Sequence, residues 1–175
     1  LLVGLRGVGK TVLLDRLRED AEATGLHTLR VEAPERRSLP ALLAPQLRLA
    51  MLRLSRTAST KALAERALRA LAGFAKALKV KYQDIEVGID FEPEPGLADN
   101  GELEQDLQAL LEAVGEAAKQ AGTALVFFVD ELQYVKEEQL AALVVALHRA
   151  AQRRLPVAMV GAGLPQLVGQ MGRAK

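Results

Sequence analysis

The feature that constrains this chain most is the run GLRGVGKT at residues 4–11. It fits the pattern G-x-x-x-x-G-K-T, and it lies between an apolar stub at residues 1–3 and a helical pattern, which is the strand, loop and helix context that the motif requires. Glycines let such a loop curl so that its N–H groups converge on phosphate oxygens, and the positive end of the following helix dipole adds to the attraction. The alternative is a chance glycine-rich turn, which this context makes a rare accident. The run therefore predicts a phosphate-binding loop, or P-loop.

The side chains of this loop have separate expected roles. Lys10 is expected to reach the outer phosphates, and Thr11 to offer its hydroxyl to Mg²⁺, because a small hard cation that bridges two phosphates prefers oxygen ligands. Arg6 could touch a phosphate or a partner, although exposure is the default at such a position. The residues expected to bind the nucleotide are Gly4, Arg6, Gly7, Val8, Gly9, Lys10, Thr11 and Val12.

Composition narrows the class of protein. With 175 residues, of which 50% are hydrophobic and 26% charged, one globular domain is expected. The absence of cysteine excludes disulfides and a zinc-thiolate site and suits a reducing, cytoplasmic location. No apolar run approaches the roughly 18 residues of a membrane span, so we expect no integral membrane protein. Because the chain opens in mid-strand without methionine, we expect residues 1–175 to be a truncated core of something longer.

Hydrophobic periodicity then sets out the first half of the chain. A helix follows the P-loop and ends at Gly25, and a short strand is predicted at residues 27–32. Ser38 is predicted to cap a second helix, and a third is predicted to start near Ser59 or Thr60. Alternation over residues 80–91 predicts a strand or hairpin, so residues 38–96 are interpreted as an insertion made of a helical pair plus this segment.

The second half continues the alternation of helix and strand. Helices are predicted from about residue 103 to Gly122 and around residues 140–147, with strands at 123–129 and 157–160 and a short helix at 164–171. The 123–129 run is apolar on both faces, as a central parallel strand must be. This pattern predicts an α/β fold: a three-layer P-loop NTPase core with a mostly parallel sheet and a helical insertion.

Two acids, Asp130 and Glu131, directly follow that apolar strand. The carboxyl ends of parallel strands are where open α/β sheets bind ligands, so Asp130 is expected to hold the Mg²⁺ shell and Glu131 to activate water as the catalytic base, with Lys10 as the second catalytic residue. Taken alone, the pair could equally be an ordinary helix N-terminus. Beside a P-loop, phosphoryl transfer to water is the better interpretation.

The loop at 4–11 together with the strand that ends in VDELQ at residues 129–133 resembles the AAA-type P-loop ATPases, most of all the bacterial and archaeal group related to Orc1/Cdc6. The resemblance implies that the Walker B strand, which ends at Asp130, and the following sensor strand lie near the P-loop strand, with ATP at the sheet edge. It also implies a fifth strand, an α-helical lid and often a winged-helix domain, which this sequence lacks.

One departure from the family pattern concerns the sensor position after the 157–160 strand. The family usually has a polar side chain there, whereas residues 159–165, MVGAGLP, offer only backbone groups. Gln133 or Gln166 could substitute, and we favour neither. Arg153 and Arg154 could serve a neighbouring subunit as arginine fingers, although a solvated pair is the simpler interpretation. Because an arginine finger contributes about 10³ to 10⁵ in rate, the isolated chain is expected to hydrolyse ATP slowly or not at all.

Charge is unevenly distributed. Residues 36–81 hold eleven bases and one acid, whereas residues 84–116 hold eleven acids and no base. The two blocks could face each other or form solvated helix faces. The sharper hypothesis is a surface for DNA or an acidic protein partner. Its expected residues are Arg48, Arg53, Arg56, Arg66, Arg69 and Lys76.

The sequence therefore predicts Mg²⁺-dependent ATP binding and hydrolysis that remodels or switches a DNA-bound or protein-bound assembly, with several copies of the chain as one arrangement. ATP is favoured over GTP because no guanine-reading N-K-x-D stretch occurs. Two alternatives remain open: a STAND-type signalling switch, and an ATP-binding module with little hydrolysis. Small-molecule kinases rank last because they lack the adjacent acid pair after a buried strand.

Overall fold

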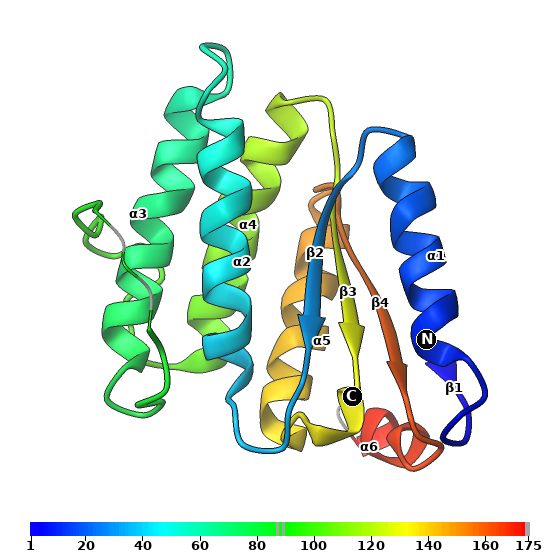
Figure 1. Cartoon of the computed structure of the whole chain (residues 1–175). Helices are drawn as coiled ribbons and strands as arrows, with labels where there is room; N and C mark the ends of the chain where they lie inside the picture. The colour runs from blue at the N-terminus through cyan, green and yellow to red at the C-terminus, as the bar shows by residue number, and fades with distance from the viewer. Residues whose placement is uncertain (87, 89, 174–175) are drawn as a thin grey trace.

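The computed structural model describes residues 1–86, 88 and 90–173. Within these residues one sheet has the strand order β1-β4-β3-β2, with all neighbours parallel. The strands are β1 (Leu2–Val3), β2 (His27–Glu32), β3 (Leu125–Asp130) and β4 (Val157–Gly163). Their carboxyl ends lie along one edge of the sheet, at the bottom of the view in Figure 1. This α/β architecture confirms the predicted fold class.

The central strand β3 is buried along its whole length. It pairs with β2 on one side and β4 on the other, so that Phe127 lies opposite Leu29 and Met159. Successive side chains of a strand point to opposite faces of the sheet. Phe128 therefore packs with Leu14 on one face, while Phe127 belongs to the larger core on the other.

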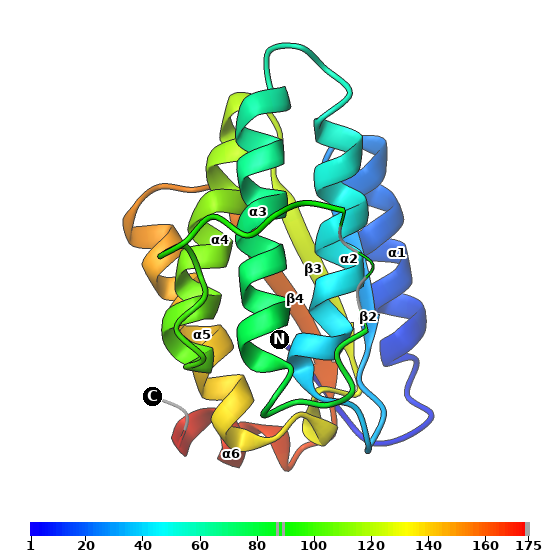
Figure 2. The same cartoon turned by 90° about the vertical axis from the view of Figure 1, so that its left-hand side faces the viewer.

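Helices cover both faces of the sheet (Figure 1). Helix α1 (Lys10–Ala23) lies on one face, and α2 (Leu39–Leu54), α4 (Leu103–Gln120) and α5 (Glu137–Gln152) lie on the other. Helix α3 (Lys61–Leu78) packs outside α2 and α4, as Figure 2 shows. The short 3-10 helix η1 (Leu132–Tyr134) and α6 (Leu167–Arg173) lie near the carboxyl edge of the sheet. Among the described residues, no helix combines the length and apolar character that a membrane crossing needs.

Local signals account for several helix ends. Gly25 has φ 85°, a left-handed conformation that glycine adopts without strain, and it follows the last turn of α1. The Ser38 hydroxyl accepts a hydrogen bond of 3.3 Å from the Ala41 N–H and so caps α2. Asp84 joins this cap, because both the N–H and the hydroxyl of Ser38 donate to its carboxylate at 2.7 and 2.8 Å.

The segment 80–91, where alternation predicts a strand or hairpin, is different in the structure. Its described residues form turns and irregular backbone, and Val87 and Ile89 lie outside the described residues. The N–H groups of Tyr82 and Ile85 donate to Leu78 and Tyr82, at 2.8 and 3.2 Å. Backbone groups that bond locally are not available to a strand ladder, so the strand prediction is corrected for the residues that are described.

Candidate functional site

The P-loop lies between β1 and α1 at the carboxyl edge of the sheet (Figure 1). Its start is fixed to the neighbouring strand, since the Gly4 N–H donates to the Gly163 carbonyl at 3.3 Å. Gly7 and Gly9 have φ values of 79° and 85°, which L side chains rarely adopt. The two glycines are therefore required for the curl of the loop into α1.

The backbone of this loop is rich in unused donors. In the part of the chain that the structure describes, the N–H groups of residues 5–12 donate to no acceptor. The first N–H groups of any helix lack partners within the helix, and here the preceding loop extends that set. Clustered N–H groups at the positive end of a helix form an anion site, and phosphate is the anion that this geometry suits.

The ammonium group of Lys10 lies inside the curl. Its Nζ atom donates to the carbonyl oxygens of Gly4 and Leu5, at 2.8 and 2.7 Å. The positive charge of Lys10 therefore lies beside the first residues of the loop. The phosphate contact of Lys10 stays a prediction.

Thr11 and Asp130 meet at the end of β3. The Thr11 hydroxyl donates a hydrogen bond of 2.6 Å to Asp130 Oδ2, while Asp130 Oδ1 accepts from the Glu131 N–H at 2.9 Å. Asp130 is 7% exposed, so its carboxylate is held in one place by two donors. One hydroxyl and one carboxylate oxygen side by side are a donor set that fits Mg²⁺, which is usually bound through one or two protein groups plus water and substrate phosphates.

Glu131 is half-buried and has φ 54°, so a non-glycine residue adopts the left-handed conformation where β3 passes into η1. Ala98 and Arg154 share this conformation, with φ values of 56° and 54°. The Glu131 carboxylate accepts a hydrogen bond from the Gln133 side-chain amide. The same amide accepts a hydrogen bond of 3.0 Å from the Leu164 N–H, directly after β4.

The remaining predicted loop residues point outward. Val8 and Val12 are 62% and 74% exposed, and Arg6 is exposed as well. The Arg6 guanidinium donates to the Tyr134 hydroxyl at 2.9 Å, which joins the loop to η1. The sequence does not predict this contact, because nothing in its pattern relates Tyr134 to a position 128 residues earlier.

The other candidates are exposed or are engaged elsewhere. Arg153, at the end of α5, forms ion pairs with Glu112 and Glu116 of α4. Arg154 is exposed and forms no ion pair within the described residues. Gln166 is exposed, unlike the buried Gln133. Of the two glutamines considered for the sensor role, Gln133 is the one that contacts a predicted site residue, Glu131.

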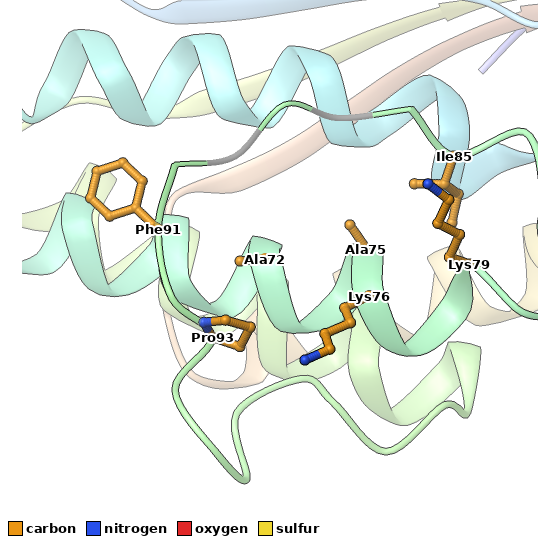
Figure 3. A pocket seen from close by; sticks show the side chains of 7 residues that line it. All are labelled: Ala72, Ala75, Lys76, Lys79, Ile85, Phe91 and Pro93. Atoms are coloured by element: carbon orange, nitrogen blue, oxygen red, sulfur yellow. The ribbon is translucent and has the colours of Figure 1, made fainter.

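Two of the surface hollows in the described part of the chain are lined by no residue of the loop. One, of about 280 Å³, lies between α3 and the segment that returns past it, lined by Ala72, Ala75, Lys76, Lys79, Ile85, Phe91 and Pro93 (Figure 3). It is on the helical side of the molecule, remote from the P-loop in Figure 1. The other, of about 520 Å³, contains Arg36, Lys81, Lys136 and two tyrosines, one of which is Tyr134. Burial, aided by the charge of Glu138, raises the pKa of the second, Tyr82.

A parallel sheet with this strand order, a P-loop of free N–H groups and an aspartate against the loop threonine define a P-loop nucleotide-binding domain. The family model described as AAA ATPase domain matches residues 1–160. The chain belongs to this family, whose activity is the binding and hydrolysis of ATP. Neither a search of curated proteins nor one of solved structures found a match.

Proposed function

We propose that this chain binds ATP with Mg²⁺ at the P-loop and hydrolyses it with Glu131 as the base. The observation that carries the proposal is the 2.6 Å hydrogen bond between Thr11 and Asp130, which brings together two motifs 119 residues apart. Each motif alone has an ordinary structural explanation. Their contact at the sheet edge matches the requirement that one metal be held from the loop and from the neighbouring strand end.

In the mechanism that follows, the N–H groups of residues 5–12 and the Lys10 ammonium bind the phosphate oxygens. Thr11 and Asp130 hold Mg²⁺, which when bound neutralises charge that develops on the phosphates. Glu131 accepts a proton from water as the water oxygen attacks the terminal phosphorus. The bond from that phosphorus to the bridging oxygen breaks, and ADP and phosphate result.

Calorimetry on the full-length protein tests the binding step. We expect ATP to release heat in Mg²⁺, weaker binding when the metal is chelated, and much weaker binding of GTP. A protein that binds no nucleotide under any of these conditions contradicts the proposal.

Within the family we infer a relationship to the Orc1/Cdc6-like ATPases, in which hydrolysis remodels or switches a bound assembly. The acid pair at Asp130 and Glu131 and the strand order support it. A STAND-type switch, or a module with little hydrolysis, uses the same loop. Multiple-turnover assays with and without DNA separate these three functions. Stimulation of turnover by DNA supports an Orc1/Cdc6-like ATPase, and a slow single turnover supports a STAND-type switch. Binding of ATP without turnover supports a module with little hydrolysis.

The partner surface that we propose is the basic segment 36–81. Part of its charge is used within the chain, because Arg66 pairs with Glu94 and Glu116 at 3.6 and 3.4 Å. Arg53 and Arg69, in contrast, are exposed and form no ion pair with any described residue. Affinity for duplex DNA that falls steeply with salt supports a phosphate-binding surface, and a flat response contradicts it.

We also propose that copies of the chain assemble, so that an arginine of one copy reaches the site of the next. Arg154 is the better candidate than Arg153, whose guanidinium already faces two glutamates. Sedimentation with ATP and Mg²⁺ tests this. A monomer at all concentrations contradicts it.

A further inference from the structure

Gln133 is a buried amide with both ends engaged. It is 6% exposed, its nitrogen donates to the Glu131 carboxylate, and its oxygen accepts from the Leu164 N–H at 3.0 Å. The orientation of the amide is determined by its partners, because a backbone N–H can only donate and a carboxylate can only accept. Gln133 therefore links the strand end that holds the acid pair to the strand end beside the P-loop.

Strand β4 leaves room for this side chain. A Cβ atom added at Gly163 would lie 2.8 Å from the Gln133 side-chain oxygen and 2.7 Å from Leu167 Cδ2. The same glycine accepts the hydrogen bond from Gly4 at the start of the P-loop. A continuous series of hydrogen bonds and contacts thus runs from Glu131 through Gln133 to the end of β4 and on to the phosphate-binding loop.

We propose that Gln133 is the positioning residue for Glu131, in the place where β4 itself contributes no polar side chain. The left-handed backbone of Glu131 lies outside regular secondary structure, so the carboxylate depends on a side-chain partner to fix its direction. Gln133 supplies that partner. Because the Gln133 oxygen accepts from the Leu164 N–H after β4, the Glu131 carboxylate is held at a fixed position relative to β4 and the P-loop. This inference rests on the proposed hydrolysis by Glu131.

Two substitutions separate the donor from the acceptor function of the amide. Gln133→Glu keeps an oxygen for the Leu164 N–H but places a second carboxylate against Glu131. Gln133→Leu keeps the approximate volume and removes both hydrogen bonds. We expect either change to lower kcat for ATP by about a hundredfold, the scale that a displacement of about 1 Å costs. ATP affinity should change less than about threefold, because the phosphates are bound by the loop.

Gly163→Ala tests the same contact from the other side. Its Cβ would displace the Gln133 amide, so we expect the same fall in kcat with little change in ATP affinity. The matched control is Gly169→Ala, where an added Cβ meets nothing within 4 Å. Thermal unfolding of each variant, followed by circular dichroism, confirms that the protein is folded, and Gly163→Ala gives a second test if a Gln133 variant is not.

The assay compares wild type, Glu131→Gln and these variants in the full-length protein. Turnover that is lost in Glu131→Gln and reduced in Gln133→Glu, Gln133→Leu and Gly163→Ala, with ATP binding kept, supports the inference. Loss in Glu131→Gln with normal kcat in folded Gln133 variants overturns the inference alone. Normal turnover in Glu131→Gln, or none in wild type, overturns the proposed hydrolysis and with it the role of Gln133.

Discussion

The Lys10 ammonium lies 2.8 Å from the carbonyl oxygen of Gly4, so that the side chain is folded back over its own loop. Its charge therefore lies against the carbonyl groups of Gly4 and Leu5 at the start of the loop. Lys10→Ala removes this charge and leaves the backbone curl in place. We expect calorimetry to detect no ATP binding by the variant. Lys79→Ala, at an exposed lysine that lines the hollow beside α3, should bind ATP as wild type does. Tight binding by Lys10→Ala contradicts the assignment.

Thr11→Val tests the metal ligand. Valine keeps the shape of threonine and removes the hydroxyl that donates to Asp130. We expect ATP affinity in Mg²⁺ to fall about tenfold and affinity in a chelator to stay the same, because only the metal-bound complex uses the hydroxyl. Thr11→Ser should retain the wild-type response. An equal loss in both conditions would show that the hydroxyl acts without the metal.

Glu131→Gln separates binding from chemistry. The amide cannot accept the proton from water, so we expect steady-state turnover to fall by about 10² to 10⁴ while ATP binding is kept. Rapid-quench measurements of turnover and calorimetric measurements of ATP binding, made on one preparation, check these two expectations. Glu104→Gln, at an exposed glutamate in the first turn of α4, is the matched control. Unchanged turnover in Glu131→Gln rules out Glu131 as the base.

The Asp84 carboxyl makes the free energy of unfolding depend on pH in the acid range. Partial burial acts to raise the pKa of its carboxyl, but the hydrogen bonds from Ser38 outweigh this effect, and the pKa lies below the ordinary value of 3.8. A depressed pKa means that the stabilisation is present above 3.8 and is lost as the pH falls through the folded-state pKa. Asp84→Asn should therefore lower the free energy of unfolding at pH 7 by about 1 kcal/mol, and the difference from wild type should shrink in strong acid.

Urea unfolding at a series of pH values measures this difference. Asp90→Asn, at an exposed carboxylate with no partner among the described residues, should have little effect at any pH. A constant difference between Asp84→Asn and wild type down to the lowest pH would show that the charge of Asp84 does not stabilise α2.

Several features of this fold are determined by residues that are close together in the sequence, and for that reason the sequence predicts them. The cap of α2 by the Ser38 hydroxyl and the curl at Gly7 and Gly9 depend on neighbouring residues. The alternation in segment 80–91 is also a local signal, but a strand needs a partner strand, and the sequence does not say whether one is near.

The two hydrogen bonds of Gln133 could not be predicted, because its partners come from the acid pair and from the residue after β4, which only the folded sheet brings together. A glutamine two positions after Glu131 and a glycine at 163 are the two signals that the sequence does contain. Neither has meaning until the strand order places β4 beside β3. The contact of Arg6 with Tyr134 was missed for the same reason.

Helix α3 packs outside α2 and α4, so two helices separate it from the sheet (Figure 2). If the proposed partner surface includes the outer face of α3, substitutions there can change the partner without disturbing the P-loop. Recognition and chemistry can therefore evolve as separate traits in this architecture.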